Sequence, residues 1–232
     1  MITSQSNETI KKLKELYTNK GRKKYNEFIV EGPHLVKEAK LAGVLKEVYT
    51  IDENLEGIQI SSSLMKQISK TDTPIKQIGV CKFINKTEIE NKVLILDSIQ
   101  DPGNMGTLLR TAKAFNFNTV FLSNECVDIY NDKVIRSSQG AIFKLNFIFG
   151  DKINFIKNLS KTHNVYSTDV NNGINVKEVK DTKVALILGN EGNGVSKEIR
   201  DLNLKNLYIK MDNTESLNVA VAGAILMYEL NN

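Results

Sequence analysis

The stretch VALILGNEGNGVS, residues 184–196, joins a short apolar run to a loop that has three glycines within six residues. The apolar run is typical of a parallel strand that is covered on both faces. Glycines directly after such a strand cost chain entropy, so they indicate close approach of a ligand or of another backbone segment. Their GxxGxG spacing is not the GxGxxG dinucleotide fingerprint, and no P-loop Gly-Lys-Ser/Thr follows. Glu191 in this loop would repel phosphate and would suit a cationic ligand.

The apolar run VLILD, residues 93–97, precedes a second unusual loop, DSIQDPGNMG, residues 97–106. A proline-glycine pair breaks the chain there, and a helix is expected over residues 106–115. Arg110 would lie just over one turn inside this helix. Its guanidinium could then reach back toward Asn104 in the loop.

A third loop leads into the apolar stretch SLNVAVAGAILMYEL, residues 216–230. Ser216 is expected to cap a helix over residues 217–230. A helix that is apolar all round is expected to be buried. Asn218 in its first turn would then need a polar partner.

Apolar runs alternate with helical patterns between these loops. The alternation predicts an α/β domain with a mostly parallel sheet and helices on both faces. Ligands bind beyond the carboxyl ends of the strands in such sheets, where the three loops lie. The expected strands are residues 93–97, 119–123, 164–168, 184–189 and 207–211, and the expected helices are residues 106–115, 153–159, 197–202 and 217–230.

A first domain, residues 1–88, is expected before a second one, residues 89–232, with a polar linker over residues 82–92. The first domain opens with an amphipathic helix near Ile10, followed by a basic turn around Gly21. Its other expected elements are strands at residues 28–32 and 48–51 and helices at residues 34–43 and 63–68, which make a small alternating α/β unit.

The chain has 232 residues and a net charge of +4, with many cations near the N-terminus. Clustered cations attract phosphate and release counterions on binding, so this stretch is a candidate RNA contact; a solvated helix face would give the same pattern. The candidate RNA-binding residues here are Lys11, Lys12, Lys20, Arg22, Lys23 and Lys24.

Several other classes of protein do not fit the sequence. No apolar run is long enough to span a membrane, and the N-terminus lacks the features of a signal peptide. With two cysteines, two histidines and no metal-ligand spacing, we expect neither a disulfide framework nor a metal site. A reducing, cytoplasmic location fits best.

Three segments, residues 104–110, 188–194 and 215–219, resemble in order the motifs of the SpoU (TrmH) family of RNA ribose 2′-O-methyltransferases in the SPOUT superfamily. The segment RSSQGA, residues 136–141, resembles a further family segment. Residues 11–39 resemble the family's RNA-binding extension, which is similar to a ribosomal-protein-type α/β fold. No single motif is specific, but three in order at the right spacing are.

The resemblance implies a deep trefoil knot in the second domain, S-adenosylmethionine as methyl donor, and a homodimer with active sites built across the interface. General topology rules would not predict a knot. By the same carry-over, the catalytic group is Asn104, Arg110, Glu191, Ser216 and Asn218; the donor pocket is lined by Leu188, Gly189, Asn190, Glu191, Gly192, Ile209, Met211, Ser216, Leu217 and Asn218; and Arg136 joins the RNA-binding residues.

The third motif departs from the family pattern. Lys210 stands where the family usually has proline, and residues 212–214 are one residue shorter and lack the usual glycine. Asn213 can replace that glycine if the loop needs a left-handed turn, which asparagine adopts more easily than most residues.

The reaction requires the ribose 2′-hydroxyl to lose its proton as it attacks a sulfonium methyl group. No histidine lies in the three loops to accept that proton. The family proposal makes Arg110 the base, but an arginine pKa above about 12 makes a neutral guanidine rare. We favour the hypothesis that Arg110 binds the adjacent phosphate bidentately and stabilises the developing alkoxide. Asn104, Ser216 and Asn218 would hold the ribose in line.

The expected substrate is 23S ribosomal RNA, because family members with this kind of N-terminal extension mostly act on large-subunit ribosomal RNA. Transfer RNA is the alternative substrate. A SPOUT enzyme that methylates a base, and an RNA-binding protein that kept the fold without catalysis, are the alternative functions. Mapping of the modified position would distinguish them.

Overall fold

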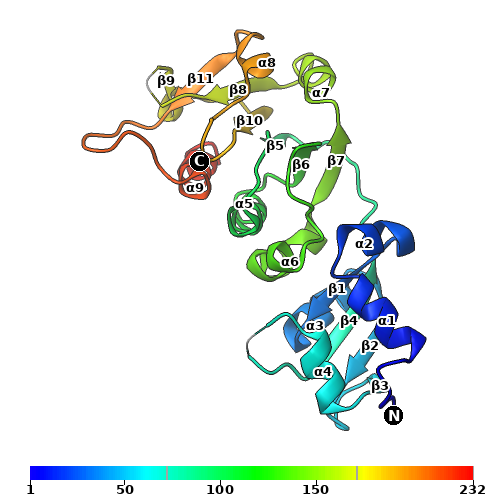
Figure 1. Cartoon of the computed structure of the whole chain (residues 1–232). Coiled ribbons are helices and arrows are strands. Elements are labelled where there is room, and N and C mark those ends of the chain that lie inside the picture. Colours follow the sequence, from blue (N-terminus) through cyan, green and yellow to red (C-terminus); the bar gives the residue numbers. More distant parts are fainter. Residues whose placement is uncertain (72, 171, 232) are drawn as a thin grey trace. The chain divides into compact units, whose positions relative to one another are not determined.

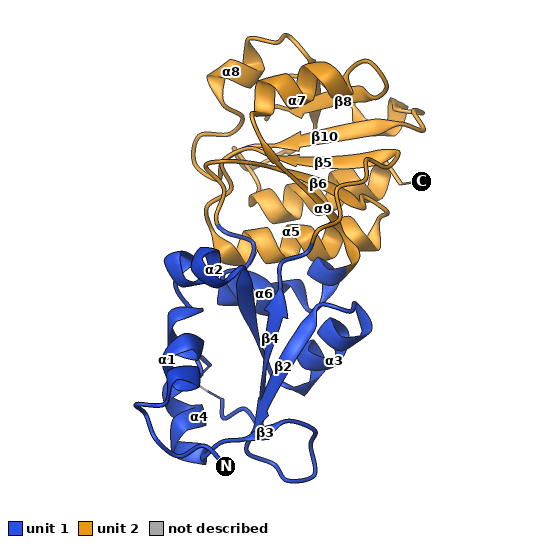
Figure 2. Cartoon of the chain, turned by 90° about the vertical axis from the view of Figure 1, so that its right-hand side faces the viewer, with its two compact units in different colours: residues 1–84, 128–143 blue, residues 85–127, 144–232 orange. Residues whose placement is uncertain are grey.

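The computed structural model describes residues 1–71, 73–170 and 172–231, and the chain divides into two compact units (Figure 2). One comprises Met1–Ile84 with Asp128–Phe143, and the other comprises Asn85–Val127 with Lys144–Asn232. We call them the N-terminal unit and the C-terminal unit.

A small mixed sheet with helices against it forms the N-terminal unit (Figure 1). Its elements are α1 (Glu8–Glu15), α2 (Asn19–Tyr25), β1 (Glu27–Glu31), α3 (Pro33–Leu41), β2 (Leu45–Thr50), β3 (Ile58–Gln59), α4 (Ser62–Ile68), β4 (Gln77–Lys82) and α6 (Asp132–Ser138). The strand order is β1-β4-β2-β3, in which β4 is antiparallel to β1 and β2, and β3 is parallel to β2. Ile10 of α1, Leu64 of α4 and Ile78 of β4 belong to its buried apolar core.

Besides β3 and α6, which the sequence did not predict, two segments of this unit differ from the prediction. Residues 19–25, expected as a basic turn, form α2, because the Thr18 hydroxyl caps the helix by accepting a hydrogen bond from Gly21 N at 3.0 Å. Residues 77–82, not predicted as a strand, form β4 between β1 and β2. Gly79 interrupts the apolar pattern of this strand, because a Cβ there would lie 2.8 Å from the side chains of Leu45 and Val30.

Residues 128–143 fold with the N-terminal unit although β6 and β7, the strands on either side of them in sequence, belong to the C-terminal unit. The ring of Tyr130 stacks on Phe28 at a centroid distance of 4.6 Å and on Phe83 at 4.3 Å. This aromatic packing sets the division between units. The division is therefore discontinuous, whereas the sequence predicted one boundary after residue 88.

A seven-stranded sheet forms the centre of the C-terminal unit. Its elements are β5 (Lys92–Leu96), α5 (Pro102–Ala114), β6 (Thr119–Ser123), η1 (Ala141–Lys144, at the junction of the units), β7 (Asn146–Gly150), α7 (Lys152–Leu159), β8 (Asn164–Thr168), β9 (Ile174–Asn175), η2 (Val176–Glu178), β10 (Val184–Leu188), α8 (Lys197–Arg200), β11 (Lys205–Tyr208) and α9 (Val219–Glu229). The strand order is β7-β6-β5-β10-β8-β11-β9, and every pair is parallel. The predicted parallel sheet is confirmed, and β7 and β9 are strands that the sequence did not predict.

Helices cover both faces of this sheet, as predicted (Figure 2). Ile156 of α7 and Ile199 of α8 pack with Ile95 and Ile187 on one face. On the other face α5 and α9 pack against each other, and α9 packs against β10. Gly223 of α9 permits this packing, since a Cβ there would lie 2.7 Å from side-chain atoms of both α5 and β10.

Two helices of the C-terminal unit begin at other residues than predicted. α5 begins at Pro102, not Gly106, because the Asp101 carboxylate caps it by accepting a hydrogen bond from Asn104 N at 2.7 Å. α9 begins at Val219 and is capped by Asn218, not by Ser216. The expectation that this last helix is buried all round was wrong, because Val221, Ile225 and Tyr228 are 50%, 37% and 52% exposed.

Candidate functional site

A cavity of about 630 Å³ lies at the carboxyl ends of β8, β10 and β11. Apolar side chains such as Leu188, Ile209 and Leu226 line it together with polar groups of the loops. Every residue predicted for the donor pocket lines this cavity except Asn218, whose two chain neighbours do. The structure therefore brings two of the three predicted loops, the second and the third, together around one space.

Residues 167–170, at the end of β8, also line the cavity and were missed by sequence reasoning. The strand itself was predicted, but nothing like the glycines or the proline of the other loops marks the residues that follow it. Ligands bind at the carboxyl ends of parallel strands, and this rule, if applied to β8 as well, would have predicted these residues as part of the site. Asp169 adds a second carboxylate to the cavity lining, besides Glu191.

The glycine loop after β10 folds back on itself. Asn190 and Gly194 exchange two backbone hydrogen bonds of 2.9 Å, and the Asn190 Oδ1 accepts bonds from the amides of Gly192 and Asn193. Gly194 has a φ of +66°, and a Cβ on Gly189 would lie 2.2 Å from the backbone of residues 194 and 195. The close approach predicted from the glycines is therefore the approach of the loop's own backbone.

Glu191 connects this loop to the loop after β5. Its carboxylate accepts hydrogen bonds from Asp101 N at 3.1 Å, Gln100 N at 3.4 Å and Asn104 Nδ2 at 3.2 Å. Burial by itself would raise the pKa of Glu191, but hydrogen bonds from backbone amides and from Asn104 outweigh it and lower the pKa. The carboxylate is therefore ionised at neutral pH, and none of the described cations forms an ion pair with it.

Asn218 connects the third loop to Asn104 and, through it, to Glu191. Its Nδ2 donates to Asn104 Oδ1 at 3.0 Å, and its Oδ1 accepts from the amides of Ala220 and Val221 at 2.9 and 3.3 Å. The predicted need of Asn218 for a polar partner is met by these contacts. Glu191, Asn104 and Asn218 thus form one continuous hydrogen-bonded group from the glycine loop, the first turn of α5 and the N-cap of α9, which we call the amide chain.

The two other predicted catalytic residues, Ser216 and Arg110, are not part of the amide chain. Ser216 is exposed and lines the cavity. Arg110 is exposed on α5, does not line the cavity, and has no hydrogen bond or ion pair within the described ranges.

Asn213 does not adopt the left-handed conformation that the sequence suggested for it, since its φ is not positive. The shortened loop is instead closed by a bond of 3.1 Å from Thr214 Oγ1 to Ser216 O.

Some of the predicted RNA-binding residues form ion pairs within the protein, and others do not. Arg22 is 3% exposed, and its guanidinium bonds Asp128 at 2.7 and 2.8 Å and Leu16 O at 3.2 Å, so it is not available to a phosphate. Lys11, Lys12 and Lys24 form ion pairs with Glu8, Glu27 and Glu15. Lys20 and Lys23 are exposed, and none of the described side chains forms an ion pair with them.

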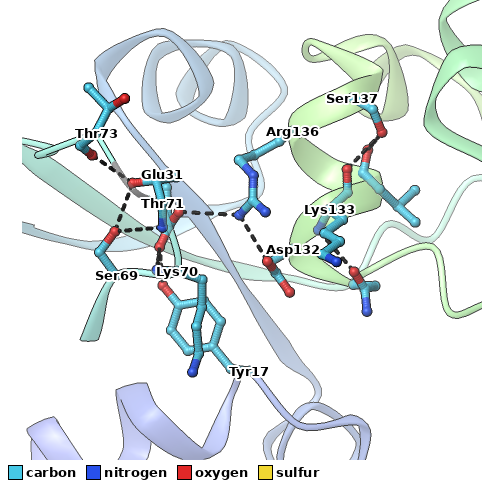
Figure 3. A network of polar contacts seen from close by, with 12 residues as sticks. Tyr17, Glu31, Ser69, Lys70, Thr71, Thr73, Asp132, Lys133, Arg136 and Ser137 are labelled. Atoms are coloured by element: carbon cyan, nitrogen blue, oxygen red, sulfur yellow. Dashed lines mark hydrogen bonds and ion pairs between the residues drawn. The ribbon is translucent and has the colours of Figure 1, made fainter. Parts of the chain in front are cut away.

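Arg136 belongs to a network inside the N-terminal unit (Figure 3). Its guanidinium lies 2.8 Å from the Asp132 carboxylate and 3.4 Å from that of Glu31, which is 2% exposed in its side chain. Glu31 also accepts bonds from Tyr17 Oη at 2.5 Å and Lys70 N at 2.8 Å. Arg136 therefore joins α6 to β1 and shares its charge with two carboxylates.

Two family models match the chain: the SpoU rRNA Methylase family over residues 91–228, and the MRM3-like substrate binding domain over residues 7–79. The chain belongs to the SpoU rRNA methylase family. This SpoU chain is 39% identical over 243 residues to the 23S rRNA (guanosine(2553)-2′-O)-methyltransferase RlmP of Bacillus subtilis (strain 168), a match that covers 99% of this chain and 98% of RlmP.

Solved structures agree with this assignment. A putative RNA methyltransferase of the TrmH family from Porphyromonas gingivalis is 30% identical, with a TM-score of 0.83 and coverage of 99% of this chain and 98% of that one. The AdoMet-bound rRNA methyltransferase from Sinorhizobium meliloti has the same fold, with a TM-score of 0.88, 23% identity, and coverage of 99% and 96%.

Membership of the SpoU family makes the chain an RNA ribose 2′-O-methyltransferase that uses S-adenosylmethionine as methyl donor. The activity and the donor predicted from the three motifs are thereby confirmed. Among the residues that the structure describes, no cluster of His, Cys, Asp and Glu could hold a metal ion. No helix in this part of the chain is long and apolar enough to cross a membrane.

Proposed function

We propose that the chain methylates the 2′-hydroxyl of a nucleotide in 23S ribosomal RNA. The observation that carries this proposal is the amide chain of Glu191, Asn104 and Asn218 beside the cavity. It gathers one carboxylate and two side-chain amides from three separate parts of the chain next to a space of the size that small-ligand sites have. The choice of ribosomal RNA is supported by the full-length similarity to RlmP, whose name specifies 23S rRNA.

The residues that line the cavity fit S-adenosylmethionine. The carboxylates of Asp169 and Glu191 suit a ligand that carries a sulfonium cation, and Leu188 and Ile209 suit an aromatic base. The donor supplies an electrophilic methyl group on sulfur. Because Glu191 is held by amides and not by a cation, its negative charge remains available to the ligand.

The side chains around the cavity would position the acceptor ribose. In this proposal Asn104, Ser216 and Asn218 hold the ribose, while Arg110 binds the adjacent phosphate and stabilises the developing alkoxide. The proton leaves to that phosphate or to water, since the guanidinium stays protonated. Positioning of this kind can supply about 7–11 kcal/mol of the barrier reduction at best.

A dimer would complete this site. Val221, Ile225 and Tyr228 follow one another at helical spacing on the exposed side of α9, which is unusual for large apolar residues unless another surface covers them. Arg110 is exposed and does not line the cavity of its own chain, so we propose that a second copy supplies it. Sedimentation of Ile225→Asp should show a monomer without activity, whereas Leu41→Asp, on the exposed end of α3, should remain dimeric and active. An active Ile225→Asp monomer would refute this arrangement.

A trefoil knot and a cytoplasmic location are also part of the proposal. The trefoil knot is supported by the sheet order, in which β10 lies between β5 and β8, and by the convergence of the loops after β10 and β11 on one cavity. Tracing the backbone in a crystal structure tests it. A ribosomal substrate would place the enzyme in the cytoplasm, which fractionation of cells tests.

The test of function is methyl transfer from radiolabelled S-adenosylmethionine to total RNA from a strain that lacks the gene, followed by mapping of alkali-resistant sites. One 2′-O-methylated site in 23S ribosomal RNA is the expected result. A site in transfer RNA would support the alternative substrate, and a labelled base would show a different reaction. No transfer by a protein that binds the donor and RNA would favour RNA binding without catalysis.

A further inference from the structure

Asp97 lies directly after β5 and is 1% exposed, yet the three motifs give it no role. Its Oδ2 accepts a hydrogen bond from Ser196 N at 2.7 Å, and its Oδ1 accepts one from Lys152 Nζ at 2.9 Å. Ser98 Oγ donates a longer bond of 3.3 Å to the same Oδ1. A buried carboxylate with this many partners is costly to form, so its position deserves a physical reason.

The reason is visible in what Asp97 holds. Its backbone N donates to Leu188 O at 2.9 Å, at the point where the glycine loop begins, and its carboxylate binds Ser196 N, where that loop ends. The residue that follows β5 therefore fixes both ends of residues 189–196. Between these ends lie Glu191 and the close contact of Gly189 with the backbone of residues 194 and 195.

Lys152 fixes the orientation of that carboxylate. It is the first residue of α7, its side chain is 12% exposed, and its Nζ also lies 3.1 Å from Glu198 Oε2 on α8. Burial would raise the pKa of Asp97, but the bonds from Lys152 and Ser196 lower it, so the carboxylate remains charged. Glu198 is 68% exposed in its side chain, so it is the minor partner of Lys152.

We infer that the buried Asp97–Lys152 ion pair is a positioning device for the methyl donor, because it holds the glycine loop in its closed form before the donor binds. This inference rests on the proposal that the cavity binds S-adenosylmethionine. A loop that is already ordered loses less conformational entropy on binding, so the pair raises donor affinity without touching the donor. Neither residue is a catalytic residue, since neither lines the cavity.

The test compares donor affinity with stability in a set of matched variants. Asp97→Asn keeps the size of the side chain and removes its charge, and Lys152→Met keeps most of the chain length and removes the cation. Lys157→Met, on the exposed side of the same helix, is the surface control. Leu94→Ala, buried on β5, controls for a loss of stability without a change at the loop. For each variant we would measure the Kd for S-adenosylmethionine by calorimetry, the melting temperature, and exchange of the Ser196 amide hydrogen.

Asp97→Asn and Lys152→Met should each raise the donor Kd about 10- to 100-fold, the size expected for a small displacement of binding groups. Ser196 should lose amide protection in both, and turnover should recover at saturating donor, so that KM for the donor changes more than kcat. Lys157→Met and Leu94→Ala should stay within about twofold of the parent, because neither contacts the loop ends.

The double variant Asp97→Asn/Lys152→Met separates positioning from folding. The double variant leaves no buried charge without its partner, which is what destabilises a single variant, so this protein should remain folded even if a single variant does not. Weak donor binding by a folded double variant supports the inference, and a Kd equal to that of the parent overturns it. If the parent protein itself fails to bind the donor, the proposed function fails, which is a different result.

Discussion

The N-terminal unit and the donor cavity hold their carboxylates with different partners: Glu27 and Glu31 are buried, whereas Glu191 is exposed. In the N-terminal unit, Glu27 pairs with Lys12 at 2.7 Å and with Lys46, and Glu31 pairs with Arg136. At the cavity, Glu191 is held by two backbone amides and by Asn104. An ion pair stabilises the fold and neutralises both of its charges. A carboxylate that is held by amides stays negatively charged and can attract a cationic ligand.

This difference shows why a cluster of lysines and arginines in the sequence overstates an RNA-binding surface. Arg22 and Arg136 hold the N-terminal unit together, so their charges are largely neutralised within the protein. Lys20 and Lys23 have no such partner among the described residues. We therefore expect the ion-paired cations of this unit to determine its stability and the unpaired ones to determine its affinity for RNA.

The largest effect is expected at Arg110, an exposed cation of α5. Arg110→Ala should lower turnover on RNA about 1,000-fold, as removal of a group that stabilises transition-state charge does, and should leave donor affinity unchanged. Single-turnover kinetics and calorimetry measure the two quantities. Lys113→Ala, a cation of the same helix, should keep its turnover. Retention of most turnover by Arg110→Ala would remove it from the catalytic group.

The next effect is on the stability of the N-terminal unit. Arg22→Met leaves Asp128 without its cation, and breaking a largely buried pair of this kind costs about 3 kcal/mol of the free energy of unfolding. Urea denaturation measures this cost. Lys23→Met, one residue along and exposed, should unfold like the parent. Equal stability of the two variants would show that Arg22 is not structural.

A smaller effect is expected at Asn218, where capping and ribose positioning coincide. Asn218→Ser can still cap α9 but loses the bond to Asn104, so methyl transfer should fall about tenfold, while donor affinity stays within about twofold. Asn218→Ala removes the cap as well and should also cost about 1 kcal/mol of stability. Equal losses of donor binding and of methyl transfer would make Asn218 a pocket residue instead.

RNA affinity should respond modestly to the exposed cations. The double variant Lys20→Met/Lys23→Met should weaken binding to RNA and reduce the slope of log Kd against log salt by about 1 to 2, because each contact releases counterions. Filter binding over a salt series measures the slope. Lys11→Met/Lys24→Met, two paired lysines, is the matched control and should change the slope less.

The smallest effect is the pH dependence of the cavity. Because hydrogen bonds lower the pKa of Glu191, its charge persists as pH falls through the ordinary glutamate value of about 4.3 and is lost only below it. The stability that this carboxylate contributes is present above its unfolded-state pKa and disappears as pH falls through the lower, folded-state pKa. Donor binding should therefore be flat from pH 7 to about 5. A decline over this range that is absent in Glu191→Gln would place a raised pKa at Glu191.

Sequence patterns predicted the C-terminal unit well because its strands are apolar on both faces and its loops carry glycine, proline and asparagine. They missed β4, where Gly79 interrupts the apolar pattern, and β7, which is partly exposed. They placed the start of α5 too late, although the Asp101-Pro102 pair is an N-terminal helix signal. The error at α5 is local, because a helix tolerates a shift of its end without a change in packing.

The sequence by itself determined the family, the reaction and the methyl donor, since three ordered motifs record residue types that the chemistry requires. Only the tertiary structure decided which residues meet. It placed residues 128–143 with the N-terminal unit, joined Glu191 to Asn218 through Asn104, and set Asp97 across both ends of the glycine loop. These contacts join residues up to 114 positions apart. Local periodicity cannot predict them, because they depend on the packing of whole elements and not on neighbours in the chain.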